Sequence, residues 1–227
     1  MITGSPPRLR VRPADLGKPR LRGWLHTFGF IFAAAGGVVL VAVAAGRPGL
    51  APVVTCAVYS VTVCGLFGVS ALYHRRVWTP RLYQVMRRLD HSMIFLFIAG
   101  TYTPFSVLLL DRRTATLILV IVWSGALAGV ALKLVWPHGP RWLSAPLYVG
   151  LGWVAVAVLP GILAGGGVVP LVLLLVGGVA YSAGAVFYAL RRPNPWPAVF
   201  GHHEFFHACT LVAATAHHVA LYFALFA

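Results

Sequence analysis

Seven apolar runs constrain this chain more than any other feature of its sequence. They lie at residues 24–45, 52–74, 89–110, 115–136, 143–160, 168–190 and 202–226. About 20 apolar residues cross the ~30 Å hydrocarbon core of a bilayer as a helix, with every backbone group bonded internally. Only 10% of the 227 residues are charged, against roughly 25% in a soluble domain. We therefore predict an all-α protein in which residues 23–227 form a bundle of seven transmembrane helices.

The basic residues predict how this bundle is oriented. The net charge of +14 would suggest a nucleic-acid partner in a soluble protein, but here Lys and Arg lie between the apolar runs, and we expect no nucleic acid. Residues 1–22 and the even-numbered connections hold 15 of the 18 basic residues. By the positive-inside rule we expect a plasma (inner) membrane protein with its N-terminus in the cytoplasm and its C-terminus outside. Residues 1–22 are predicted to be a basic, flexible cytoplasmic tail.

Rare polar residues gather at one depth of this predicted bundle. His203 and His207 open the last run at i and i+4, so both side chains lie on one helix face. Ser70 and His74 have the same spacing at the end of the second run, and Asp90 opens the third run. The predicted topology brings all five residues to the cytoplasmic side of the membrane. Ionisable groups inside a membrane are costly and usually mark function.

The chemistry of this set suits zinc. Three imidazoles, from His74, His203 and His207, together with one open position are common in catalytic zinc sites. Asp90 could accept a hydrogen bond from a water at the open position and act as general base, or it could orient a ligand. Ser70 could bond to a ligand or donate to a developing oxyanion. We therefore predict Zn2+ as cofactor.

Each of these residues also has a structural interpretation. His74 could be an interfacial side chain, and His203 and His207 could form hydrogen bonds between helices. Asp90 could cap the N-terminus of its helix. Ser70 could bond to a carbonyl of its own helix.

Three further ionisable residues lie in or near the apolar runs. The segment from His203 to His207 matches the zincin motif, in which the glutamate (here Glu204) is the general base, so peptide hydrolysis stays open. The role of Glu204 is left undecided. His217, about 15 Å further along the helix, is interpreted as an interhelical hydrogen-bonding group or part of a polar path. His26 is expected to be interfacial.

Three separated motifs resemble the hemolysin III family, the bacterial relatives of the adiponectin and progestin receptors. They are Ser70-Ala-Leu-Tyr-His74, then Leu89-Asp90-His91-Ser92 with Ala99 to Phe105, and His203 to His207 with His217 further on. The resemblance covers residues 22 to 227. It implies a seven-helix bundle that holds zinc through His74, His203 and His207, with Asp90 reaching the metal through water and Ser70 close by. A wider kinship with alkaline ceramidases implies amide hydrolysis of lipids.

Three functions follow from these features. The first is an intramembrane zinc hydrolase that acts on an amide or ester bond of a membrane lipid. The second is a non-catalytic sensor or homeostasis protein that binds membrane lipids and in which the zinc is structural. The third is a pore-forming cytolysin, as the family name suggests, although the apolar runs look like permanent spans.

Overall fold

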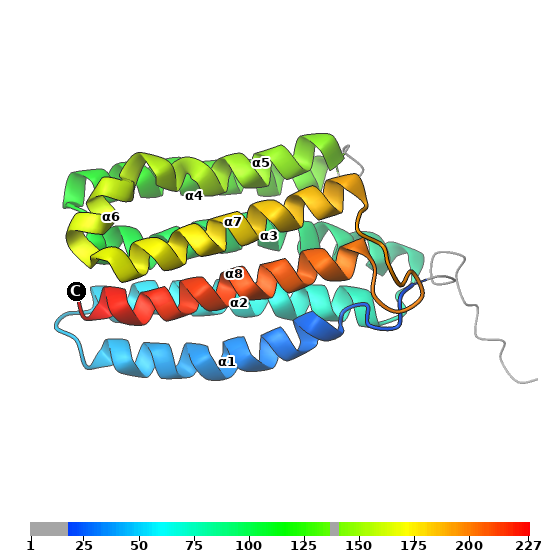
Figure 1. Ribbon diagram of the computed structural model, residues 1–227, viewed down its shortest axis with the longest axis horizontal. Helices are drawn as coiled ribbons and strands as arrows, with labels where there is room; N and C mark the ends of the chain where they lie inside the picture. The colour runs from blue at the N-terminus through cyan, green and yellow to red at the C-terminus, as the bar shows by residue number, and fades with distance from the viewer. Residues whose placement is uncertain (1–17, 137–140) are drawn as a thin grey trace, which may run out of the picture.

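The computed structural model describes residues 18–136 and 141–227 of the chain, and this described part is all-α apart from one isolated bridge between Trp196 and Phe200. The helices run along the long axis of the molecule and lie side by side (Figure 1). Their bounds are α1 Trp24–Ala45, α2 Ala51–Arg75, α3 Pro80–Leu109, α4 Arg112–Val135, α5 Arg141–Trp153, the 3-10 helix η1 Val154–Val158, α6 Leu159–Gly166, α7 Val168–Leu190 and α8 His202–Leu225.

Seven helical segments of the described chain are long and apolar enough to cross a membrane: α1 to α4, a combined span Ala145–Gly166, α7 and α8. Large apolar side chains face outward on these helices; Phe32 and Val61, for example, are 74% and 71% exposed. Aromatic side chains such as Tyr59 and Phe95 fill the interior instead. An apolar exterior around a packed interior is what a bundle surrounded by lipid requires. The predicted fold class is confirmed.

Helix α3 is longer than the sequence predicted. It begins at Pro80 and not at residue 89, and the side chain of Thr79 accepts a hydrogen bond from the Leu82 amide as the N-cap. A search for apolar runs misses residues 80–88 because this first part of the helix carries Arg81, Arg87 and Arg88. Proline fits at the first helical position, where its missing N–H is not needed.

The fifth span is interrupted by a short 3-10 helix that lies between Pro146 and Pro160. It consists of α5, the 3-10 helix η1 and α6, and it ends at Gly166 and not near residue 160. The hydroxyl of Tyr102 on α3 accepts a hydrogen bond from the Ala155 amide inside η1 (2.6 Å). Irregular backbone is tolerated at membrane depth when neighbouring helices supply such partners.

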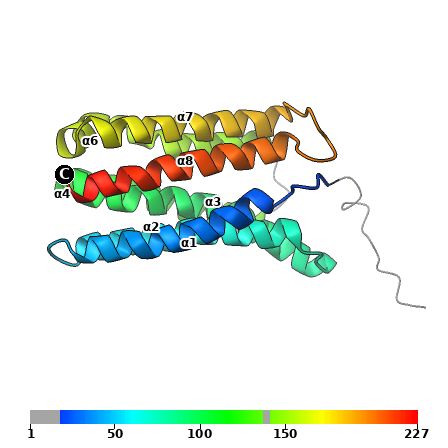
Figure 2. The same cartoon turned by 60° about the horizontal axis from the view of Figure 1, so that its bottom comes forward.

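One end of the bundle carries the histidines, and we call it the histidine end: the end where α2 finishes and α8 begins. In Figures 1 and 2 it is the end from which the chain enters α1, opposite the C-terminus. Of the predicted tail, residues 1–17 lie outside the described residues. Arg20 and Leu21 donate backbone hydrogen bonds to Ala198 and Val199 in the loop before α8 (3.0 and 3.2 Å).

Candidate metal centre

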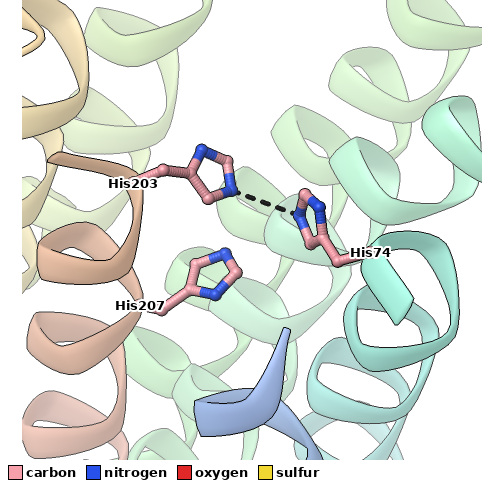
Figure 3. A group of neighbouring side chains, drawn as sticks. All are labelled: His74, His203 and His207. Atoms are coloured by element: carbon pink, nitrogen blue, oxygen red, sulfur yellow. Dashed lines mark hydrogen bonds between the residues drawn. The ribbon is translucent and has the colours of Figure 1, made fainter. Parts of the chain in front are cut away.

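Three histidine side chains from two helices meet at the histidine end. His74 comes from the last turn of α2, and His203 and His207 come from the first two turns of α8. Their candidate ligand nitrogens all lie within 4.8 Å of one another. Figure 3 shows the three rings pointing toward one another across the gap between the helices. The structure thus brings together the three residues that the sequence predicts as a ligand set.

One pair of these nitrogens has the spacing expected for two ligands of a tetrahedral ion. The Nε2 atoms of His74 and His203 are 3.2 Å apart. Two ligands at a Zn–N distance of 2.0–2.1 Å in a tetrahedron are about 3.3 Å apart. The Nδ1 atom of His207 is buried and has no hydrogen-bond partner among the described residues. Three imidazoles of this kind form a donor set typical of zinc.

Asp90 on α3 and Ser70 on α2 are the other two predicted site residues. Both line the same cavity as the three histidines. The Asp90 carboxylate also lies 3.6 Å from Nδ1 of His91. Because Thr79 caps α3, Asp90 stands in the helix interior, and its interpretation as an N-cap is wrong.

Glu204 is occupied in a structural role. Its side chain is fully buried, and one carboxylate oxygen accepts a hydrogen bond from the Gly201 amide at the start of α8 (2.8 Å). The other oxygen forms an ion pair with Arg22. With both oxygens engaged, the carboxylate is poorly placed to act as the general base of a zincin, which argues against the peptidase interpretation.

His26 is buried, and the expectation that it would be interfacial is wrong. Its side chain is only 2% exposed, and its ring stacks on His207 with centroids 3.7 Å apart. Its place near the start of an apolar run suggested the membrane surface. Its sequence position could have indicated this place. His26 is near the start of α1, at the same end of the bundle where His203 and His207 begin α8.

A cavity of about 540 Å³ extends from the cluster through the bundle. At the histidine end it is lined by polar and charged groups, among them the three histidines, Asp90 and Lys133. Further along, its walls are mostly apolar, with Phe105, Leu159 and Ile162 toward the opposite end. Pockets of 300–1,000 Å³ commonly hold one small-molecule ligand.

His217 lines the same cavity at greater depth. Its Nε2 atom hydrogen-bonds to the Leu174 carbonyl of α7 (3.2 Å), so it is an interhelical hydrogen-bonding group, one of the two predicted interpretations. A Cβ atom at Gly177 would lie 2.2 Å from this nitrogen. The absence of a side chain at Gly177 is what lets the imidazole reach the α7 backbone.

Fold and site together define a class: seven-helix membrane proteins with a histidine cluster at one end of a cavity in the bundle. The family described as "Haemolysin-III related" matches residues 15–218 of the chain. The chain belongs to this family. It is a multi-pass protein of the plasma membrane.

Known relatives agree with this assignment. A "Hemolysin-3 homolog" of Bacillus subtilis (strain 168) is 31% identical over 194 residues, which cover 84% of this chain and 86% of that protein. "Hemolysin-3" of Bacillus cereus is 31% identical over 170 residues, 74% of this chain and 76% of that protein. "Heptahelical transmembrane protein ADIPOR2" of Oryza sativa subsp. japonica is 34% identical over 116 residues, covering 48% of this chain and 39% of that protein. The last similarity supports the relationship to the adiponectin receptors.

Proposed function

We propose that the protein is a zinc-dependent hydrolase that cleaves an amide or ester bond of a membrane lipid. The observation that carries this proposal is the place of the three imidazoles, which stand at the polar end of a cavity with apolar walls. His74, His203 and His207 would hold the ion. Zinc supplies Lewis acidity at such a site, polarising a carbonyl and making water nucleophilic near neutral pH.

The lining of the cavity suits an amphiphile. Its polar end lies at the histidine end, which the positive-inside rule would put at the cytoplasmic face. The basic residues that line it there are Lys18, Arg22, Arg87 and Lys133. The apolar remainder of the cavity would take a hydrocarbon chain, whose burial is favourable at ~25 cal/mol per Å². A membrane lipid has both parts.

Asp90 is the residue we assign to proton transfer. Its side chain lines the same cavity as His74, His203 and His207. Asp90 would take a proton from the attacking water as the new bond to the carbonyl carbon forms. It would then return that proton to the nitrogen or oxygen of the leaving group as the C–N or C–O bond breaks. General acid–base catalysis of this kind contributes about 10²–10⁴-fold in rate.

The test is lipid turnover by the purified full chain in vesicles that contain a ceramide, an N-acyl amide and a phospholipid, with products followed by mass spectrometry. We expect hydrolysis of one of these lipids by the zinc-loaded wild type. Asp90→Asn should keep its zinc and lose about 100-fold or more in rate. If the zinc-loaded wild type releases no product from any of the three classes, the proposed catalysis is wrong.

A second function is favoured by the origin of the ligands. They come from α2 and α8, so one ion would link two helices across the cavity. A sensor with a structural ion could use that link to couple lipid binding to the arrangement of the bundle. In that case removal of the metal should lower the melting temperature, and no lipid should be hydrolysed before or after removal.

A further inference from the structure

The imidazole of His26 lies flat against the imidazole of His207. The two ring centroids are 3.7 Å apart and the ring planes differ by 12°. His207 is the candidate ligand that is most deeply buried, with 2% exposure. We propose that His26 is a positioning residue, which holds the ring of His207 by stacking and does not itself bind the metal. This inference rests on the metal centre proposed above.

The stacked arrangement separates His26 from the ligand set. The lone pair of an imidazole nitrogen lies in the plane of its ring, so a ligated ion must lie near that plane. The rings of His26 and His207 are nearly parallel, with centroids 3.7 Å apart, so an ion in the plane of one ring lies outside the plane of the other. By contrast, His203 is inclined to His74 by 76° and to His207 by 61°, so the planes of these three rings can converge on one point.

The packing around His26 leaves its ring little freedom. The edge of Phe67 on α2 contacts it, with centroids 5.0 Å apart and an interplanar angle of 62°. Gly23 and Gly29 lie one turn away on either side. A Cβ at Gly23 would lie 2.8 Å from Cβ of His74, and one at Gly29 would lie 2.7 Å from Leu211. These two glycines let α1 approach both ligand-bearing helices closely.

An ion pair fixes the same contact one turn nearer the histidine end. Arg22 precedes His26 by four residues, and Glu204 precedes His207 by three. Their side chains form the buried ion pair described above. The start of α1 is therefore attached to the first two turns of α8 at two successive levels, first by charge and then by the stacked rings.

The ring face, and not the nitrogen atoms, makes the contact. Neither Nδ1 nor Nε2 of His26 has a hydrogen-bond partner among the described residues. Replacing a buried polar group that lacks a partner by an apolar group of the same shape is commonly neutral or stabilising. Phenylalanine at this position should therefore preserve the positioning of His207, whereas a side chain without a ring should not.

The experiment compares His26→Phe and His26→Leu in the full-length, detergent-purified protein. Zinc affinity is measured by competition with a chelator, and Co2+ is substituted to record the visible spectrum of the site. His218→Leu is the matched control, because His218 is a stacked histidine outside the cluster: it lies on α8, and its ring stacks on Tyr59, which is not a ligand (centroids 5.8 Å apart). We expect His26→Leu to weaken zinc binding about 10–100-fold, as loss of residues that orient ligands does. His26→Phe and His218→Leu should bind within about threefold of wild type, and the Co2+ spectrum of His26→Phe should match that of wild type.

Two results would overturn the inference. If His26→Phe loses as much affinity as His26→Leu and its Co2+ spectrum changes, His26 is a ligand. If His26→Leu binds zinc as wild type does, stacking does not position His207. A wild type that binds no metal would instead refute the metal centre itself. Melting temperatures of the metal-free variants verify folding, and that of His26→Phe should equal or exceed the wild-type value.

Discussion

The two ends of the bundle use ionisable side chains in opposite ways. At the end opposite the histidines, Asp111 is exposed and accepts hydrogen bonds from the Arg113 and Thr114 amides, two and three residues away. At the histidine end, Glu204 is fully buried and its ion-pair partner, Arg22, is 182 residues away in sequence. The first carboxylate serves its own helix terminus, and the second joins α8 to the segment that precedes α1, next to the histidine cluster. The role of a charge in this protein depends on its burial and on the distance to its partner in the chain.

Removing the buried carboxylate should have the largest effect on stability. Glu204→Ala leaves Arg22 without its partner and the Gly201 amide without its acceptor. Breaking a buried ion pair costs about 3–5 kcal/mol, and the 19% exposure of Arg22 places the expected loss toward the lower value. Thermal unfolding in detergent measures it.

A double-mutant cycle sharpens this prediction. Glu204→Gln can still accept from the Gly201 amide, and combining it with Arg22→Met removes both charges. The double variant should be more stable than Glu204→Gln alone. If the stability lost by the double variant equals the sum of the losses of Glu204→Gln and Arg22→Met, the two side chains do not stabilise each other.

Two glycines allow the same comparison at the level of the backbone. Gly23 at the histidine end and Gly49 at the opposite end have φ of 80° and 81°. Alanine in a left-handed conformation costs about 1–2 kcal/mol at either position. A Cβ at Gly23 would also lie 2.8 Å from Cβ of His74, whereas one at Gly49 would meet nothing within 4 Å. We expect Gly23→Ala to lower both the melting temperature and the zinc affinity, and Gly49→Ala to lower only the melting temperature. Equal zinc affinity in the two variants would mean that the start of α1 does not influence His74.

The exposed cap should have the smallest effect. Asp111→Ala removes the acceptor for two backbone amides at the start of α4, and a fall of about 2–4 °C in melting temperature is the most we expect. Asp111→Asn keeps a good N-cap and is the control.

Hydrogen bonds from Thr114 hold the pKa of Asp111 below its usual value. The contribution of Asp111 to stability should therefore be present above the pKa that Asp111 has in the unfolded chain. It should be lost as the pH falls through the lower pKa that Asp111 has in the folded protein. If Asp111→Ala lowers the melting temperature as much as Glu204→Ala does, the contrast between the two ends of the bundle is wrong.

The spans and the histidine cluster could be predicted from the sequence because each depends on a regular spacing. Apolar runs of about 20 residues locate the helices, and the alternation of successive spans across the membrane puts His74 and His203 at the same end. The beginning of α3 at Pro80 could not be found in this way, since its first turns are rich in arginine. A pattern based on apolar residues cannot detect a helical turn that lies beyond the apolar run.

The contacts that hold the histidine cluster in place could not be predicted from the sequence. The Arg22–Glu204 pair joins residues at opposite ends of the chain, and no local pattern connects them. The stacking of His26 on His207 depends on how closely α1 approaches α8. That approach is set by side-chain packing at Gly23 and Gly29, which periodicity does not describe.

The most direct test of the metal centre is the metal content of the detergent-purified full chain, measured by mass spectrometry for wild type, His74→Ala, His207→Ala and His218→Ala. The first two variants remove a ligand from each of the two helices, and the third removes an imidazole of α8 outside the cluster. We predict about one zinc per chain in wild type and His218→Ala, and almost none in the other two. Equal zinc in all four proteins would contradict a metal centre formed by α2 and α8.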